Sequence, residues 1–251
     1  MGDQVTIGLI GYGRFGKLAA RLIARHATVL VYTRRKACGR LPSRRIKAAS
    51  LADVAAQKVV ILAVPISALQ QTILSINPLL QPQSLILDVC SVKLKPVQWM
   101  RQMLPKHVSV VGAHPLFGPE SVSLSLRGRT IVLCPVRVSP GLLARVKRAL
   151  KQEGLHVLQM TPHEHDRMMA ETVLLTQYIG RLVGAARLKR WQRSTVHYER
   201  LMSLVDATER DSEQLFREMW KYNPFARRLG VALNRSRGRF QGVPSLKRWS
   251  S

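Results

Sequence analysis

The sequence predicts an α/β protein in which a doubly wound parallel sheet precedes an all-helical C-terminal domain. Apolar, strand-like runs alternate with helical segments up to residue 160, and a glycine loop, "GYGRFG", follows the first run. Beyond residue 161 these runs stop, and apolar residues recur three and four positions apart, as on one face of a helix. Strands that alternate with helices of this length imply right-handed crossovers and a sheet covered on both faces. We therefore expect one domain at residues 1–161 and a second at residues 162–229.

The strands expected in the first domain are short and mostly apolar. They are residues 4–10, 28–33, 58–65, 84–90, 108–112, 129–136 and 155–160. Helices are expected from the glycine loop to residue 26, over residues 67–76 and over residues 140–153. Residues 59–87 carry no charge, but Pro65, Pro78 and Pro82 interrupt them. We therefore expect strand, helix, loop and strand there rather than a membrane span.

The second domain is expected to consist of helices, because its apolar residues follow helical spacing. Examples are Val173, Leu174, Ile179, Leu182 and Val183. Residues 230–251 are rich in Arg, Ser and Gly and contain no acidic residue. Such a composition cannot bury a core, so we expect a basic, mobile tail there.

The net charge of the chain is unusually high. Its 251 residues include 40 Lys and Arg against 14 Asp and Glu, which gives +26. Such a balance suggests a nucleic acid or another anionic ligand. The basic residues are, however, spread along the chain, and no basic and aromatic motif of an RNA-binding module is present. We interpret the charge as a general property of the surface and do not expect nucleic-acid binding.

The cysteines and the N-terminal residues indicate a cytoplasmic protein. Cys38, Cys90 and Cys134 are odd in number and lack the spacing of disulfide pairs or metal ligands. The first residues lack the basic and apolar pattern of a secretory signal. We therefore expect neither disulfides nor a metal site nor attachment to a membrane.

The glycine loop has the form of a dinucleotide-binding turn. Gly11 permits a tight turn, Gly13 lets a pyrophosphate approach the backbone, and Gly16 lets the helix pack on the strand. The helix N-terminus presents N–H groups and the positive end of its dipole to the phosphates. Because the loop lies between an expected strand and helix, it predicts a Rossmann-like domain. The residues expected at the cofactor are Gly11, Gly13, Arg14, Phe15, Gly16, Thr33, Arg34, Arg35, Val64 and Pro65.

The residues at the end of the second expected strand indicate whether the cofactor is NAD or NADP. An NAD site usually carries Asp or Glu at this point, whereas this chain has Thr33, Arg34 and Arg35. An arginine can hold a 2′-phosphate with two hydrogen bonds, and a threonine hydroxyl can donate to it. A solvated basic loop is the alternative, and we favour NADP as the cofactor.

The stretch "GAHPLFGPES", residues 112–121, holds His114 on a stiff corner. Pro115, Gly118 and Pro119 predict a rigid bend directly after a strand. A rigid bend is where a reacting side chain is commonly held. A tight turn whose histidine caps a backbone group is the alternative interpretation.

Four stretches, in this order, resemble the prephenate and arogenate dehydrogenases of tyrosine biosynthesis, and they are most similar to the plant-type arogenate enzymes. They are "GLIGYGRFG", "DVCSVK", "HPLFGPES" and, in the helical domain, "HD" (His165 and Asp166) with "LVDATERDSEQLF". The resemblance implies an NADP-dependent oxidative decarboxylation. Arogenate would give tyrosine, and prephenate would give 4-hydroxyphenylpyruvate.

The resemblance also implies roles for three residues at the reacting centre. Hydride leaves C4 of a cyclohexadienol, the 4-hydroxyl loses its proton, and the ring carboxylate leaves as CO2. His114 is implied as the base, because histidine titrates close to working pH. Ser91 would orient the hydroxyl and the imidazole. Lys93 would supply charge for an anionic substrate or support the site from behind.

The helical domain departs from the family at Gln177, where the family usually has a histidine. Glutamine keeps hydrogen bonding but cannot carry charge, which leaves room for a shifted substrate or reduced activity. Arg181 and Arg210 are the expected partners of a substrate carboxylate, although either could be a surface arginine. Asp166 is the expected partner of the ammonium of arogenate, which we favour as substrate. The alternative for Asp166 is a cap on the helix that begins at Pro162.

Two other functions compete with the dehydrogenase. One is a non-catalytic NADP-binding protein of the same fold that lost its chemistry at Gln177, and the other is a basic nucleic-acid-binding protein. Ser91 and His114 together argue against the first. The family and the apolar helical domain imply a homodimer.

Overall fold

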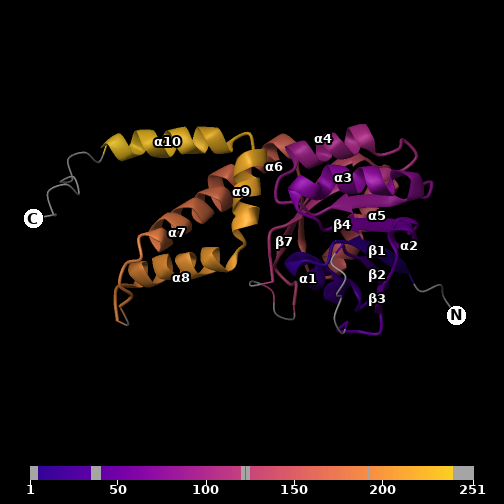
Figure 1. Cartoon of the computed structure of the whole chain (residues 1–251), viewed down its shortest axis with the longest axis horizontal. Helices are drawn as coiled ribbons and strands as arrows, with labels where there is room; N and C mark the ends of the chain where they lie inside the picture. The colour runs from indigo at the N-terminus through magenta and orange to yellow at the C-terminus, as the bar shows by residue number, and fades with distance from the viewer. Residues whose placement is uncertain (1–4, 35–40, 120–121, 123–124, 192, 240–251) are drawn as a thin grey trace, which may run out of the picture. The chain divides into compact units, whose positions relative to one another are not determined.

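The computed structural model of the chain describes residues 5–34, 41–119, 122, 125–191 and 193–239. The chain divides into two compact units, Met1–His165 and Asp166–Ser251. The sequence indicated this boundary near residue 161. The first unit contains all the described strands and the second unit is helical, as Figure 1 shows.

An eight-stranded sheet forms the centre of the first unit (Figure 1). Its strands are β1 (Thr6–Ile10), β2 (Thr28–Tyr32), β3 (Ile46–Ala48), β4 (Val59–Leu62), β5 (Leu85–Asp88), β6 (Ser109–Pro115), β7 (Thr130–Arg137) and β8 (His156–Gln159). Their order across the sheet is β3-β2-β1-β4-β5-β6-β7-β8. From β3 to β6 all neighbours run parallel, so their carboxyl ends meet at one edge. Ligands bind at this edge in doubly wound folds.

The expected doubly wound parallel sheet is confirmed, with one antiparallel pair in it, because strand β7 runs antiparallel to β6. A parallel connection needs a crossover, usually a helix. The described residues between Pro115 and Thr130 contain no helix, so the chain turns back directly. As a result, His114 lies opposite Val132 in the register of β6 and β7.

The helices of the first unit are α1 (Arg14–Ile23), α2 (Leu51–Ala55), α3 (Ile66–Ile76), the 3-10 helix η1 (Asn77–Leu79), α4 (Leu94–Met103) and α5 (Pro140–Gln152). The order β4, α3, η1, β5 confirms the expected strand, helix, loop and strand of the uncharged segment. No helix in the described part of the chain is long and apolar enough to cross a membrane. The sequence analysis missed β3, α2 and α4. A local signal exists for α2, where Ser50 and Asp53 form a capping box.

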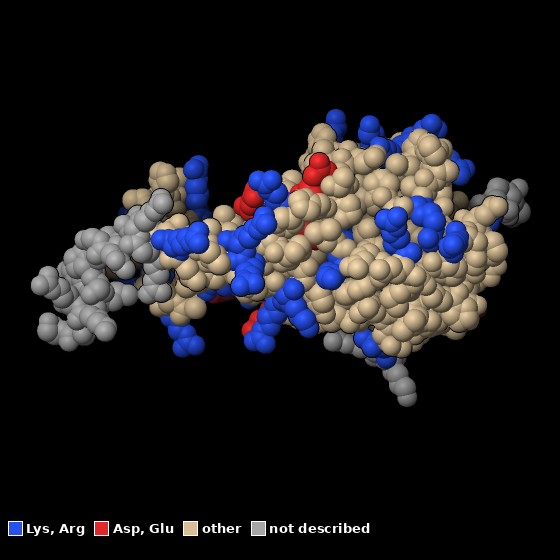
Figure 2. All heavy atoms as spheres, turned by 90° about the horizontal axis from the view of Figure 1, so that it is seen from above, with Lys and Arg blue, Asp and Glu red and all other residues tan. Residues whose placement is uncertain are grey.

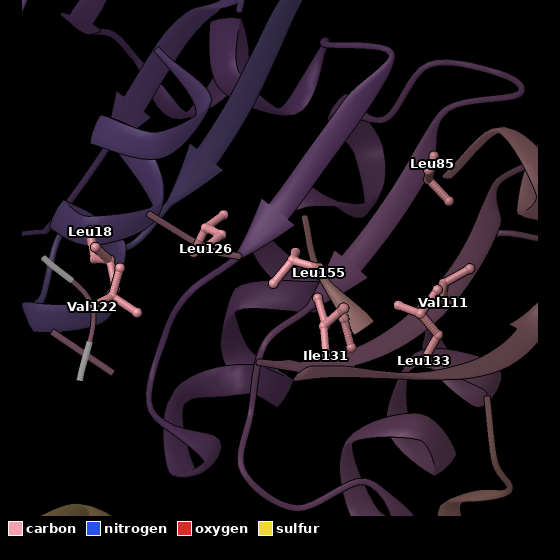
Figure 3. Close-up of a cluster of buried hydrophobic side chains, with 9 residues drawn as sticks. Leu18, Leu85, Val111, Val122, Leu126, Ile131, Leu133 and Leu155 are labelled. Atoms are coloured by element: carbon pink, nitrogen blue, oxygen red, sulfur yellow. The ribbon is translucent and has the colours of Figure 1, made fainter. Parts of the chain in front are cut away.

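Two clusters of buried side chains illustrate how the described part of the first unit packs. One combines Leu85, Val111 and Leu133 from the strands with Leu18 from α1 (Figure 3). The other joins β1 and β2 and includes Leu9, which is fully buried. Removing this apolar surface from water stabilises the sheet and thereby fixes the strand ends that carry the candidate site.

The second unit is built from helices joined by short connections. They are α6 (Pro162–Met169), which begins in the first unit, the π-helix η2 (Ala170–Leu174), α7 (Leu175–Ala185), α8 (Val196–Arg210), α9 (Glu213–Tyr222) and α10 (Ala226–Arg239). Helices α7 and α8 pack closely because residue 180 is a glycine. A Cβ atom on Gly180 would lie 2.5 Å from Oγ1 of Thr208.

The expected tail is helical in its described part, which corrects the boundary drawn at residue 230. Helix α10 continues to Arg239, while residues 240–251 lie outside the described residues. Helix α10 packs against α9, and Gly230 lies beside the ring of Trp220. Tertiary packing therefore overrides a composition that is typical of mobile tails.

Candidate active site

The glycine loop between β1 and α1 is held by backbone contacts that only glycine permits at two positions. Gly11 has a φ of +104°, and its N–H donates to the carbonyl of Tyr32 over 2.8 Å. A Cβ on Gly16 would lie 2.2 Å from the carbonyl oxygen of Gly11. Around Gly13, by contrast, a Cβ would meet no atom within 4 Å. The loop is therefore tightly packed on its protein side and open at Gly13.

The N-terminus of α1 suits an anionic group. Gly13 is its N-cap and provides no side-chain cap, and the first turn contains no acidic residue. The first N–H groups of any helix lack intrahelical partners, and the helix dipole adds positive potential there. Arg14 is exposed, whereas Phe15 is half-buried against the core. Of these two residues, Arg14 is the better placed to meet a phosphate.

The remaining residues expected at the cofactor lie just beyond β2 and β4. Thr33 is half-buried and Arg34 is exposed, while Arg35 lies outside the described residues. Val64 is half-buried, and Pro65 is the N-cap of α3. Because β1, β2 and β4 are parallel neighbours, these residues share one edge of the sheet with the glycine loop.

A buried ion pair lies behind this edge, between Asp88 and Lys93. Both side chains are fully buried, and the Lys93 ammonium donates to Oδ2 of Asp88 and, over 2.7 Å, to the carbonyl of Ala113. The backbone N–H of Cys90 donates to the same carboxylate oxygen over 3.0 Å. A Cβ on Gly112 would lie 3.3 Å from the Lys93 stem, so glycine leaves room for it.

The burial of Lys93 corrects its assignment as a catalytic residue. A fully buried ammonium already bonded to Asp88 does not meet a substrate. The alternative is that Lys93 holds the residues of the site in place without touching the substrate. Its bond to Ala113 anchors β6 one residue before His114. Ser91, in the loop between Asp88 and Lys93, is half-buried, and it follows a strand that pairs with β6.

His114 lies near the end of β6 and is 7% exposed. Its Nδ1 is 2.8 Å from Nε2 of His165, and the two rings meet edge to face with centroids 5.0 Å apart. Burial, the neighbouring His165 and the charge of Lys93, in that order, lower the pKa of His114 well below 6.5. The ring is therefore neutral at physiological pH, as a general base must be. Its Nδ1 is not a cap on a backbone group, because the partner is another imidazole.

His165 contacts His114, and the sequence analysis assigned it no role. It was noted only as part of the "HD" pair, and the role was assigned to its neighbour, Asp166. Its side chain is fully buried on α6. The sequence carries one usable signal, a capping box of Thr161 and Glu164 that begins the helix one turn before His165.

The structure supports neither role expected for Asp166, the contact with a substrate ammonium or the helix cap. Its side chain is fully buried, which does not support the expected contact with a substrate ammonium. It is the fifth residue of α6, and the cap is provided by Thr161 and Glu164 instead. Its backbone carbonyl accepts from the Asn223 side chain over 2.8 Å.

Gln177 and Arg181 form a structural link in the second unit rather than an open binding site. The Gln177 amide donates to the carboxylate of Asp211 and accepts from Nε of Arg181. The Arg181 guanidinium donates to the carbonyl of Asp211 over 3.0 Å and lies over the ring of Phe216. These contacts tie α7 to the junction of α8 and α9. Arg210, at the end of α8, is exposed, so it stays a prediction as a substrate partner.

Metal chemistry has no candidate in the part of the chain that the structure describes. No group of three or more His, Cys, Asp or Glu side chains there could hold an ion. The free cysteines Cys90 and Cys134 are both buried.

Two protein-family models match parts of the chain. The one described as "Prephenate dehydrogenase, nucleotide-binding domain" matches residues 34–159, and "TYRAAT1-like, C-terminal domain" matches residues 182–240. Among curated relatives, arogenate dehydrogenase 1 of Arabidopsis thaliana is 29% identical over 90% of this chain, and arogenate dehydrogenase 2 is 28% identical over 89%. The matched region spans only 37% and 65% of those two proteins.

Solved structures share the fold. Prephenate dehydrogenase from Aquifex aeolicus, in complex with hydroxyphenyl propionate and NAD+, covers 100% of this chain with a TM-score of 0.75 and 17% identity. The match covers 93% of that protein. Synechocystis arogenate dehydrogenase covers 98% of this chain with a TM-score of 0.67 and 23% identity, and the match covers 96% of that protein. The Rossmann-like sheet with a helical C-terminal region is thus shared with both.

Proposed function

The chain belongs to the prephenate dehydrogenase family, and on this premise we propose that it catalyses the NADP-dependent oxidative decarboxylation of arogenate or prephenate. The observation that carries the proposal is the imidazole of His114. It is buried, its pKa is lowered, and it lies on the strand next to the one that leads to Ser91. A neutral imidazole at the ligand-binding edge of the sheet is what deprotonation of a substrate hydroxyl requires.

The proton transfer uses the second nitrogen of the ring. Nδ1 of His114 is engaged with His165, so Nε2 is the atom that takes the hydroxyl proton. The water-poor surroundings keep the ring neutral before the reaction and strengthen each polar contact during it. Ser91 orients the hydroxyl toward Nε2, and Lys93 holds β6 in place through the Ala113 carbonyl.

The residues at the sheet edge fit a dinucleotide. The space around Gly13 leaves room for a pyrophosphate, and the first turn of α1 has no carboxylate to repel it. A bound nicotinamide cofactor supplies the hydride acceptor. Thr33 and Arg34 would hold the 2′-phosphate of NADP, because an exposed guanidinium stands where an NAD site usually has an acidic residue.

We favour arogenate over prephenate as the substrate, but Asp166 is not the reason. The buried carboxylate of Asp166 gives no reason to prefer an ammonium. The preference rests on two relatives that are named arogenate dehydrogenases. Arg210 is the remaining candidate for a substrate carboxylate.

A homodimer in the cytoplasm completes the proposal. The helical unit exposes large apolar side chains, among them Leu182 and Trp191, which association of two copies would cover. Analytical ultracentrifugation measures the oligomeric state. Fractionation of the source cells measures the location.

The distribution of positive charge on the surface does not favour nucleic-acid binding, the other function considered. On the face seen in Figure 2, Lys and Arg side chains lie in several separate groups, with Asp and Glu between some of them. A duplex is usually bound by a contiguous basic stripe. Duplex binding tighter than about 10⁻⁶ M at physiological salt would favour this function instead.

The test is direct. The full chain is incubated with NADP or NAD and with arogenate or prephenate, and the formation of reduced cofactor is followed by its absorbance. NADP with arogenate should give the highest kcat/KM. Absence of reduced cofactor with all four combinations would support a dinucleotide-binding protein without catalysis.

A further inference from the structure

The contact between His114 and His165 allows only two arrangements of hydrogen. With 2.8 Å between Nδ1 of His114 and Nε2 of His165, one hydrogen lies between the two nitrogens. If His165 supplies it, His114 carries its own hydrogen on Nε2 and can only donate to a substrate hydroxyl. If His114 supplies it, Nε2 of His114 is a bare acceptor.

We infer that His165 is a positioning residue that accepts a hydrogen bond from Nδ1–H of His114 and thereby keeps Nε2 of His114 ready to take the substrate proton. The inference rests on the proposed function, because only a base needs this tautomer. His165 must then carry its own hydrogen on Nδ1. The arrangement makes His165 the counterpart of the group that orients the histidine in other acid–base sites, with an imidazole in that position.

The structure holds His165 firmly enough for this role. Its side chain has no exposed surface, and its backbone N–H donates to the carbonyl of Thr161 over 3.0 Å in the first turn of α6. That turn is closed by the reciprocal bonds of Thr161 and Glu164. The His165 ring meets the His114 ring edge to face, at an interplanar angle of 68°.

The charge that develops during the reaction strengthens the same contact. When Nε2 of His114 takes the proton, its Nδ1–H donates from a cation, and such bonds are about twice as strong as neutral ones. His165 contributes no negative charge, and the neighbouring Lys93 is paired with Asp88. We therefore expect His165 to matter less than a carboxylate would, about 10- to 100-fold in kcat.

Two variants of nearly equal size separate positioning from packing. His165→Leu fills the space without an acceptor, whereas the carbonyl of His165→Gln can accept from Nδ1–H. We expect His165→Leu to lower kcat by about 10- to 100-fold with KM and cofactor Kd unchanged, and His165→Gln to stay within about threefold of wild type. His163→Leu changes an exposed histidine on the same helix and serves as the control. Equal losses in the Leu and Gln variants would overturn the inference.

A second measurement is made on the wild-type chain and does not depend on catalytic activity. Proton–nitrogen correlation spectra of the full chain with isotope-labelled histidine show which ring nitrogen of each of its seven histidines carries hydrogen. The signals are assigned with His114→Asn and His165→Gln. We expect hydrogen on Nδ1 of His114 and none on Nε2, and the reverse would overturn the inference. If the tautomer is as expected but no substrate is turned over, the proposed function fails while the contact stands.

Discussion

Two glycines of the same loop allow the fold and the cofactor site to be tested separately. A Cβ added at Gly16 would lie 2.2 Å from the carbonyl oxygen of Gly11, a backbone atom that cannot rotate away. A Cβ added at Gly13 would meet no protein atom within 4 Å. Gly13 also has an extended backbone, with φ of −74°, that any residue adopts. Alanine at the two positions therefore perturbs different properties.

The structure sets the expected magnitudes. Gly16→Ala forces α1 away from the loop and should lower the free energy of unfolding by about 1–3 kcal/mol or more, the usual cost of overpacking. Gly13→Ala changes only the N-cap, and it should cost less than about 1 kcal/mol. The new methyl group then lies where a pyrophosphate would approach the helix N-terminus. A steric cost of about 1–3 kcal/mol there weakens cofactor binding roughly 5- to 150-fold.

Urea denaturation of the two variants and of wild type measures the free energy of unfolding. Titration with NADPH, followed by its fluorescence, measures the cofactor Kd. Gly13→Ala should keep its stability and lose affinity, while Gly16→Ala should lose stability first. Normal NADPH affinity in Gly13→Ala would refute the location of the pyrophosphate. Normal stability in Gly16→Ala would refute the tight packing of the loop.

Three further predictions concern the cofactor preference, the base and the buried ion pair. Arg34→Asp should abolish the preference for NADP over NAD, because a carboxylate would face the 2′-phosphate. Steady-state kinetics with both cofactors measure this, and a wild type that uses NAD better would contradict the assignment. His114→Asn should lower kcat by about 10²- to 10⁴-fold without changing the cofactor Kd. Because the pKa of His114 is lowered, the ring stays neutral as the pH falls toward 6.5, and the wild-type rate should begin to fall only below pH 6.5. A fall above pH 6.5 would exclude His114 as the group that titrates. Lys93→Met should lower the free energy of unfolding by about 3–5 kcal/mol, since it leaves the Asp88 charge buried without its ammonium. The double variant Asp88→Asn, Lys93→Met should recover part of that loss in urea denaturation, and equal stability of Lys93→Met and wild type would show that the pair is dispensable.

Much of the first unit follows from local sequence patterns. The glycine loop, the alternation of strands and helices, and the uncharged segment after residue 59 each predict the elements found there. These signals depend on neighbours within about one turn of helix or a few strand residues, so a sequence displays them directly. The short elements β3 and α2 were missed because three and five residues carry too little periodicity. Helix α4 was missed although its ten residues make it as long as α1.

The sequence by itself predicted a strand that ends just before His114, and an earlier strand that leads to Ser91 and Lys93. In the structure β6 continues through His114 to Pro115. Only the tertiary structure decided the partners of these residues. It brings His165 to His114 across 51 positions, buries Lys93 against Asp88, and joins Arg181 to the backbone of Asp211. The physical reason is that each contact depends on how separate elements pack, and side chains with the same local pattern can end in solvent or in the core.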